Sequence, residues 1–197
     1  MELPVGEFIS QGLDKEVPEA ARTLLESNVK DEIKHDLALG FIVESHGADP
    51  IAEMEAIRLR DAWIQHPDHT ILKALVAERA IFFVLLPMFR FLGDAALRTV
   101  SADISRDEQI HVATNSLVCR ELGLVPSNSL DKLRKATISW VLQPLKTSPD
   151  KHLDKSFWLD ASDRLMYEGK APQFADTKAA RMPAFFEHAN TNLPQYA

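Results

Sequence analysis

The sequence contains the pattern Glu-x-x-His twice, at Glu32–His35 and at Glu108–His111. In both places apolar residues recur at helical spacing, and residues three apart on a helix lie on the same face. Each pair can therefore offer a carboxylate and an imidazole to the same point. Dinuclear metal sites in helical bundles combine two such pairs with one glutamate from each of two further helices. The repeated pattern predicts half of such a site.

Glu78 is a candidate for one of the missing carboxylates. It stands in an apolar stretch, where a carboxylate is costly unless it is paired or bound to a metal. It precedes Glu108 by thirty residues, with Gly93 midway between them. In an antiparallel hairpin that turns at Gly93, a rise of about 1.5 Å per residue brings the two carboxylates level. We therefore predict that Glu78, Glu108 and His111 form one half of the site.

The carboxylate for the other half must come from the N-terminal segment. Glu7 is the nearest acid in a helix-compatible context, whereas Glu2 stands thirty residues before Glu32 and repeats the spacing of the first half. We favour Glu7 and keep Glu2 open. Sites rich in carboxylates with one imidazole per metal suit Fe or Mn better than Zn. The predicted cofactor is two Fe ions, or an Mn/Fe or Mn/Mn pair, and Phe82 would help to keep it dry.

Composition favours an all-α protein with one domain over residues 1–197. Hydrophobic residues make up 46% of the chain, and there are only seven glycines. The formal net charge is −7 without a basic stripe, which argues against nucleic acid as a partner. The N-terminus lacks the features of a signal peptide, and no apolar run could span a membrane. Together with the single Cys119, this predicts a cytoplasmic protein.

Apolar spacing and capping residues divide the chain into helices. Asp49, Asp94 and Ser129 are the expected N-caps of three of them, and Pro87 is expected to bend a fourth. After an apolar-polar segment over residues 5–13, the expected helices cover about 18–45, 50–66, 70–92, 95–122, 130–142, 153–168 and 177–190.

Several segments resemble the small, radical-generating subunit of class I ribonucleotide reductase, a family of the ferritin-like superfamily. The segment Ile104–His111 is similar to that family's Ile-x-Arg-Asp-Glu-x-x-His motif, and Glu78–Phe82 is similar to its helix with a single Glu. Val17–Ala20, and more loosely Phe185–Glu187, also resemble family segments.

The resemblance implies a ferritin-like four-helix bundle core with additional C-terminal helices. It also implies a homodimer, a large catalytic subunit as partner, and O2 as reactant. The metal ligands would be Glu32, His35, Glu78, Glu108 and His111. Asp107 would hold a ligand imidazole from outside the metal site.

One departure from the family pattern changes the functional prediction. The family's radical tyrosine follows the first ligand histidine by four residues, and that position is Leu39 here. The chain has only Tyr167 and Tyr196, and its first tryptophan is Trp63, so the family's N-terminal tryptophan has no counterpart. We expect an O2-activating di-metal protein that resembles a minimal small subunit without its radical tyrosine.

Two alternatives stay open. The first is a stand-alone di-metal oxidase or oxygenase, in which Leu39 leaves room for a small organic substrate. The second is a protein for metal storage, or a scaffold that has lost the metal.

Overall fold

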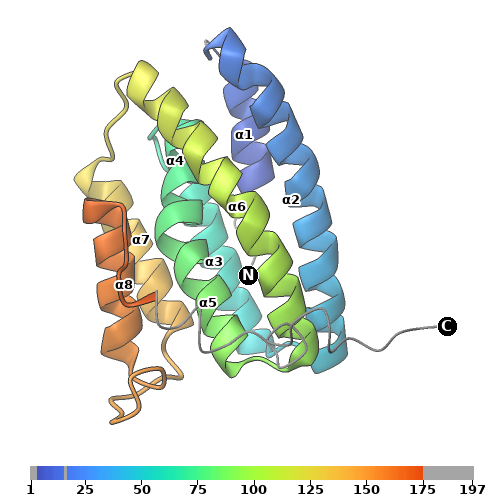
Figure 1. The fold of residues 1–197 in the computed structure, drawn as a ribbon, viewed down its shortest axis with the longest axis vertical. Coiled ribbons are helices and arrows are strands. Elements are labelled where there is room, and N and C mark those ends of the chain that lie inside the picture. Colours follow the sequence, from blue (N-terminus) through green and yellow to red (C-terminus); the bar gives the residue numbers. More distant parts are fainter. Residues whose placement is uncertain (1–3, 16, 175–197) are drawn as a thin grey trace, which may run out of the picture.

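The computed structural model describes residues 4–15 and 17–174, and their fold is all-α, as the composition predicts. Its elements are, in chain order, α1 (Val5–Leu13), α2 (Glu19–His46), α3 (Pro50–Gln65), α4 (Thr70–Ala77), the π-helix η1 (Glu78–Phe82), α5 (Phe83–Leu92), α6 (Ala95–Glu121), α7 (Asn128–Val141) and α8 (Lys155–Glu168) (Figure 1). Because α4, η1 and α5 follow one another without a break, they form one central helix over residues 70–92. Over the described ranges there is no strand, and no helix is both long and apolar enough to cross a membrane.

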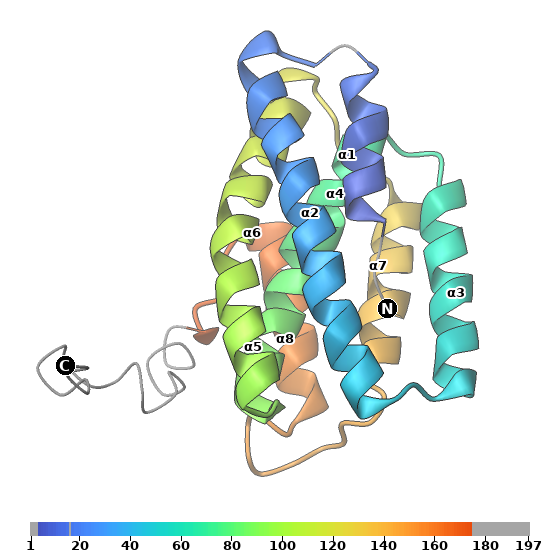
Figure 2. The ribbon, with the colours of Figure 1, turned by 90° about the vertical axis from the view of Figure 1, so that its right-hand side faces the viewer.

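The central helix is covered on several sides by other helices. α1 packs on α2 and α4, α2 packs on α6, and α5 packs on α6. α8 packs on η1 and α5, and α7 packs on η1 and α4, while α3 contacts α7. Figure 2 shows α2 and α6 side by side along most of their length. Every residue of α4 is buried, which explains its almost wholly apolar sequence.

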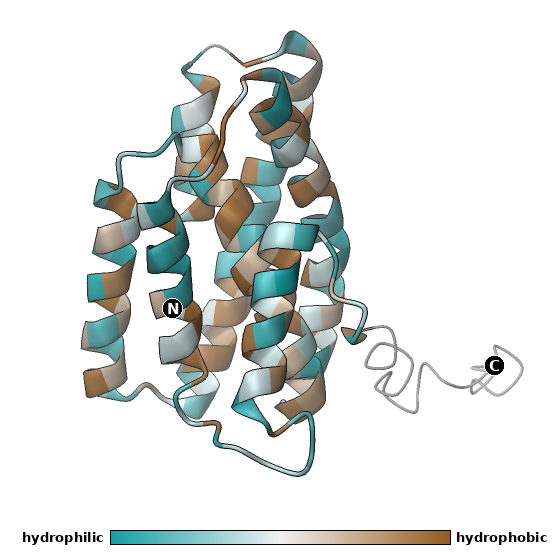
Figure 3. Ribbon diagram, turned by 90° about the vertical axis from the view of Figure 1, so that its left-hand side faces the viewer, coloured by the Kyte–Doolittle hydropathy of each residue, from teal (hydrophilic) through white to brown (hydrophobic). Residues whose placement is uncertain are grey.

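The flanking helices contain both hydrophilic and hydrophobic residues (Figure 3), and several large hydrophobic residues of α2 and α3, such as Phe41 and Met54, are exposed. The buried apolar side chains meet in one cluster, which includes Phe8, Trp63, Ile81 and Trp158. Cys119 is buried within the same cluster, and burial, together with the charge of Glu78, raises its pKa to about 12. Cys119 is therefore a small hydrophobic residue of the core.

The predicted helices are confirmed over residues 18–168, with most ends within about two residues of the structure. The segment over residues 5–13, for which we predicted no helix, forms α1. Asp49 caps α3 by accepting the N–H of Ile51, and Asp94 caps α6 by accepting the N–H of Leu97. The predicted cap at Ser129 is wrong. The hydroxyl of Ser127 accepts the N–H of Leu130 instead, so α7 begins earlier. The helix expected over 177–190 lies outside the described residues.

The turn at Gly93 and Asp94 forms as predicted and brings α6 back alongside the central helix. A Cβ atom at position 93 would clash with the carbonyl oxygen of Phe89, so only glycine fits there. The central helix is irregular, but not where we placed the bend. Its π-helical turn begins at Glu78 and ends before α5, which contains Pro87.

Contacts with α8 stabilise the π-helical turn. The hydroxyl of Ser162 donates to the carbonyl oxygen of Ala80 at 2.6 Å, and Arg79 Nε donates to the carbonyl oxygen of Leu165 at 2.7 Å. A π-helical turn leaves backbone groups outside the regular hydrogen-bond pattern, so such side-chain partners compensate for it. Single π-helical turns of this kind are frequent at functional sites, and this one starts at a predicted ligand.

Candidate metal centre

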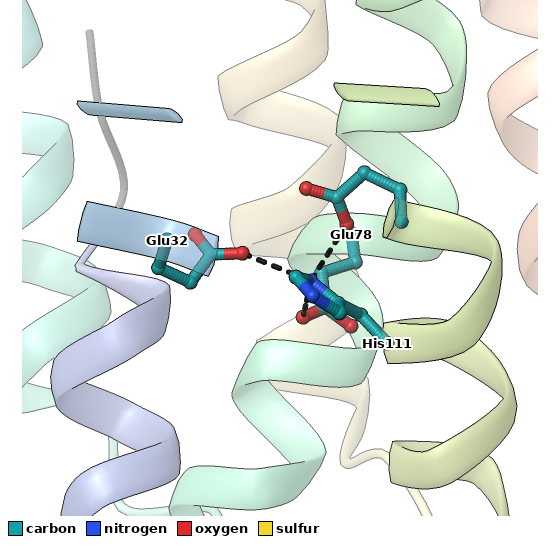
Figure 4. Close-up of side chains that lie close together, drawn as sticks. Glu32, Glu78 and His111 are labelled. Atoms are coloured by element: carbon teal, nitrogen blue, oxygen red, sulfur yellow. Dashed lines mark ion pairs between the residues drawn. The ribbon is translucent and has the colours of Figure 1, made fainter. Parts of the chain in front are cut away.

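Four acidic and imidazole side chains from three helices meet in the interior. Glu32 comes from α2, Glu78 from the start of η1, and Glu108 and His111 from α6, and all four are buried. One potential ligand atom from each lies within 4.8 Å of the others, which is close enough to hold a metal ion. Figure 4 shows Glu32, Glu78 and His111 pointing toward one another from these three helices.

His35 lies beside this group and completes the second Glu-x-x-His pair. Its Nδ1 atom is 3.6 Å from Glu32 Oε1 and 3.5 Å from Glu108 Oε1. On the other side, His111 Nδ1 is 3.0 Å from Glu32 Oε1 and 3.6 Å from Glu108 Oε2. The two oxygens of Glu108 thus face different imidazoles. The structure thus brings together the five residues that we predicted as ligands, which are the two Glu-x-x-His pairs and Glu78.

Most of the inward-facing atoms of this cluster have no hydrogen-bond partner. They are Glu32 Oε1, Glu78 Oε1, both carboxylate oxygens of Glu108, and the Nδ1 atoms of His35 and His111. Buried polar groups are normally satisfied, and unpaired buried carboxylates are especially costly. A cation among these atoms would satisfy all of them at once. The residues present therefore fit a metal ion.

The pKa values of the cluster follow from its crowding. Burial and the charge of Glu108 raise the pKa of Glu78 well above its usual range. Burial alone would lower the pKa of His111, but Glu108 and Glu32 raise it to about 10, and the same two glutamates act on His35 in the same way. The metal-free cluster thus retains protons, and a metal ion would displace them.

Each imidazole also faces an aspartate on its outer side. His35 Nε2 lies 3.1 Å from Asp107 Oδ2 on α6, and His111 Nε2 lies 3.7 Å from Asp31 Oδ2 on α2. A carboxylate that is hydrogen-bonded in this position, as Asp107 is, fixes the orientation and tautomer of a ligand imidazole. The 3.7 Å from Asp31 to His111 is longer than a hydrogen bond, and His111 Nε2 has no hydrogen-bond partner. Asp107 was expected in such a role, whereas Asp31 was missed. The sequence did carry the signal, since the longer pattern Asp-Glu-x-x-His also occurs twice, at 31–35 and 107–111.

Asn115 is a second residue that the sequence reading missed. It is fully buried on α6, and its Nδ2 donates to Glu78 Oε2 at 2.8 Å. It follows His111 by four residues, so helical spacing places it on the same face. Asn115 fixes one oxygen of Glu78 and leaves the other free for a ligand.

Glu7, which we favoured as a ligand from the sequence, does not join the cluster. It is exposed on α1 and accepts a hydrogen bond from Gln11 Nε2 at 2.9 Å. The inner face of α1 is formed by its buried residues Val5, Phe8, Ile9 and Gly12. Next to Glu32 stands Gly6, where an added Cβ would lie only 3.0 Å from Glu32 Cβ. The alternative, Glu2, lies outside the described residues.

A cavity of about 880 Å³ opens onto the cluster. Glu32, His35 and Glu108 line it at the metal site, and Leu39 and Phe82 belong to its apolar wall. Both residues were expected beside the metals. Tyr167, by contrast, is 60% exposed on α8, where its hydroxyl donates to Asp131 at 2.6 Å. No tyrosine in the described part of the chain lines the cavity or belongs to the cluster.

Comparison of the chain with models of known protein families, with curated proteins and with solved structures finds no match in any of the three.

Proposed function

We propose that this chain is a di-metal carboxylate protein that activates O2 on a ferritin-like four-helix bundle. The observation that carries the proposal is the set of buried, unpaired oxygen and Nδ1 atoms contributed by Glu32, His35, Glu78, Glu108 and His111. Such atoms destabilise a protein unless a cation satisfies them. The arrangement of α1, α2, the central helix and α6 agrees with the bundle in which such sites occur.

Two ions fit the arrangement better than one. Glu108 presents Oε1 to His35 and Oε2 to His111, and Glu32 Oε1 lies 3.6 Å and 3.0 Å from Nδ1 of the same two imidazoles. Both carboxylates therefore lie between the two histidines and would hold ions there. Glu78 would complete the set of oxygen ligands, which favours Fe or Mn. When bound, a pair of reduced Fe or Mn ions supplies two electrons to O2. The apolar wall of the cavity would exclude water, and Asp107 would hold the imidazole of His35 in place.

The cavity favours a stand-alone oxidase that acts on a small organic substrate. Leu39 borders open space next to His35 and Glu108, so a substrate could approach the metals where the related family has its radical tyrosine. The second candidate is a minimal ribonucleotide reductase small subunit, which the Arg106-Asp107-Glu108 segment supports. In that case the metal pair itself would store the oxidising equivalent.

Anaerobic reconstitution with Fe(II) or Mn(II), followed by elemental analysis and an O2 electrode, tests the proposal. We expect two metal ions per chain and rapid O2 uptake by the reduced protein. Glu108→Ala should lose both, whereas Glu7→Gln should keep both. A chain that binds neither Fe(II) nor Mn(II) would be the metal-free scaffold. A metal-loaded chain that does not consume O2 would refute O2 activation.

A mixing experiment separates the two candidate roles. Deoxyribonucleotide formation that requires both this chain and a class I large subunit would establish the small-subunit role. Oxidation of a small molecule without any large subunit would establish the stand-alone role.

Loss of an outer aspartate should weaken metal binding without removing a ligand. We expect Asp107→Ala to lower metal affinity by about 10- to 100-fold, because His35 loses its partner. Asp31→Ala should have a smaller effect, since its oxygen lies 3.7 Å from His111. Competition with a chromogenic chelator measures the affinities. The matched control is Asp103→Ala, because Asp103 is exposed on the same helix and pairs only with Arg106. Equal affinities for Asp107→Ala and Asp103→Ala would contradict the assigned role.

A further inference from the structure

The cavity beside the metal centre has the size and lining of a binding site for a small molecule. Its volume of about 880 Å³ falls within the range of about 300–1,000 Å³ that is typical of ligand sites. Well-packed interiors contain few voids larger than a water molecule, so a space of this size is not a packing defect. One end is formed by Glu32, His35 and Glu108, which ties the cavity to the metal centre.

The walls of the cavity are mainly apolar. They come from the C-terminal half of α2, from α5, from α6 and from the end of α7. Leu39, Leu86, Phe89 and Ile104 are among them, and Trp140 of α7 also lines the space. Contact with these side chains stabilises a hydrocarbon or aromatic group, at roughly 25 cal/mol for each Å² of apolar surface removed from water.

The exposed charged residues that line the cavity are acidic. They are Asp36, Glu44 and Asp49, whereas Glu32, His35 and Glu108 at the inner end belong to the metal centre. Among the described residues that line the cavity there is no lysine or arginine. A polar group of a ligand that lies at these exposed side chains therefore meets like charge if it is an anion and opposite charge if it is an amine.

We propose that this cavity binds an elongated apolar molecule whose polar end is neutral or an amine and lies at these exposed carboxylates, with its apolar part toward the metal centre. The inference deepens the proposed function, on which it rests, by naming the substrate class of the metal site. Binding itself depends on the walls of the cavity, so it can be measured without any turnover.

Gly40 offers a way to block the cavity without disturbing the core. It lines the cavity from within α2, and no atom lies within 4 Å of where its Cβ would be. A larger side chain should therefore be tolerated there, and replacing a helical glycine favours the helix. Val43 gives a second blocking position, because it lines the outer part of the cavity and is 50% exposed. Leu37→Phe is the matched control, since Leu37 is on the same helix, 61% exposed, and does not line the cavity.

The test uses the full chain and two ten-carbon probes: decylamine and decanol. Binding is followed by the fluorescence of Trp140, with Trp140→Phe identifying its contribution against Trp63 and Trp158. We expect both probes to bind, and we expect added salt to weaken the binding of decylamine more than that of decanol, because only the amine pairs with the exposed carboxylates. Gly40→Phe and Val43→Phe should lose binding, whereas Leu37→Phe should retain it.

Two results would overturn the inference. One is the absence of binding by both probes, and the other is unchanged binding of both probes to the two blocked variants. Metal content is measured on the same samples, so the two proposals fail separately. Probe binding by a chain that takes up no metal would refute the di-metal function and leave the ligand class supported. Metal uptake and O2 consumption without probe binding would refute the ligand class and leave the di-metal function supported.

Discussion

Glu78→Gln should make the metal-free protein more stable while abolishing the stabilisation that metal provides. The carboxyl group of Glu78 is fully buried, and its Oε1 has no hydrogen-bond partner. Burial and the charge of Glu108 raise its pKa well above the usual range. Glutamine keeps the shape and can still accept the hydrogen bond from Asn115, but it removes the ionisable group. We expect a gain of about 1–3 kcal/mol in the free energy of unfolding, the usual penalty for an unsatisfied buried polar group.

The size of this effect depends on pH. An acid whose pKa is raised on folding lowers stability at every pH above its unfolded value of 4.5, and the penalty is complete above its folded pKa. The advantage of Glu78→Gln should therefore be largest at neutral or higher pH and shrink as the pH falls toward 4.5. Urea unfolding in the presence of a chelator measures it.

In the same urea titrations with Fe(II) or Mn(II) present, the original chain should be more stable than Glu78→Gln. A ligand present at about 1,000 times its Kd stabilises the folded state by roughly 4 kcal/mol, and the variant should gain little of this. Glu7→Gln, which changes an exposed carboxylate of the same type, should match the original chain under both conditions. A Glu78→Gln variant that is less stable without metal, or equally stabilised by it, would show that Glu78 is structural.

The helices and the core of the site could be predicted because they depend on local periodicity. Each Glu-x-x-His pair shares a helix face by geometry alone, and the thirty residues from Glu78 to Glu108 fix their alignment once Gly93 makes the turn. A carboxylate within a wholly apolar stretch is also visible in the sequence. These signals hold regardless of how the remaining helices pack.

Glu7 shows where this reasoning stops. One face of α1 is buried, and its residues recur at helical spacing: Val5, Phe8, Ile9 and Gly12. We predicted no helix over residues 5–13, so this spacing did not inform the choice of Glu7. In the structure Gly6 approaches Glu32, and Glu7 is exposed. The capping of α7 by Ser127 was missed because two serines stand close enough for either to act.

The π-helical turn and the cavity had no local signal at all. η1 begins at Glu78 because contacts with α8, among them Ser162 to Ala80, support an irregular backbone there. The cavity exists because α2, α5, α6 and α7 fail to fill the space between them. Both features result from the spatial arrangement of distant segments. The cavity is also the feature on which the proposed stand-alone role depends.

Arg134→Ala should cause the largest loss of stability of any substitution outside the metal centre. Arg134 is fully buried between α7 and α8, with hydrogen bonds to Asp131 at 2.8 Å, Asp163 at 2.7 Å and Ser162 at 2.6 Å. Ser162 in turn donates to the carbonyl oxygen of Ala80 inside η1. The substitution breaks a buried ion-pair network and leaves a cavity, so we expect a loss of about 3–5 kcal/mol.

Because this network ends on the π-helical turn, Arg134→Ala should also weaken metal binding, although the residue touches no ligand. Urea unfolding and chelator competition on the same preparation measure both effects. Arg134→Met, which fills most of the volume, should restore part of the stability but not the metal affinity, since Ser162 remains without its donor. Arg164→Ala is the control, because Arg164 pairs with Asp160 and Glu168 on the surface of α8, where ion pairs contribute little. If Arg134→Ala loses stability but binds metal like the original chain, then α8 supports the fold without positioning Glu78.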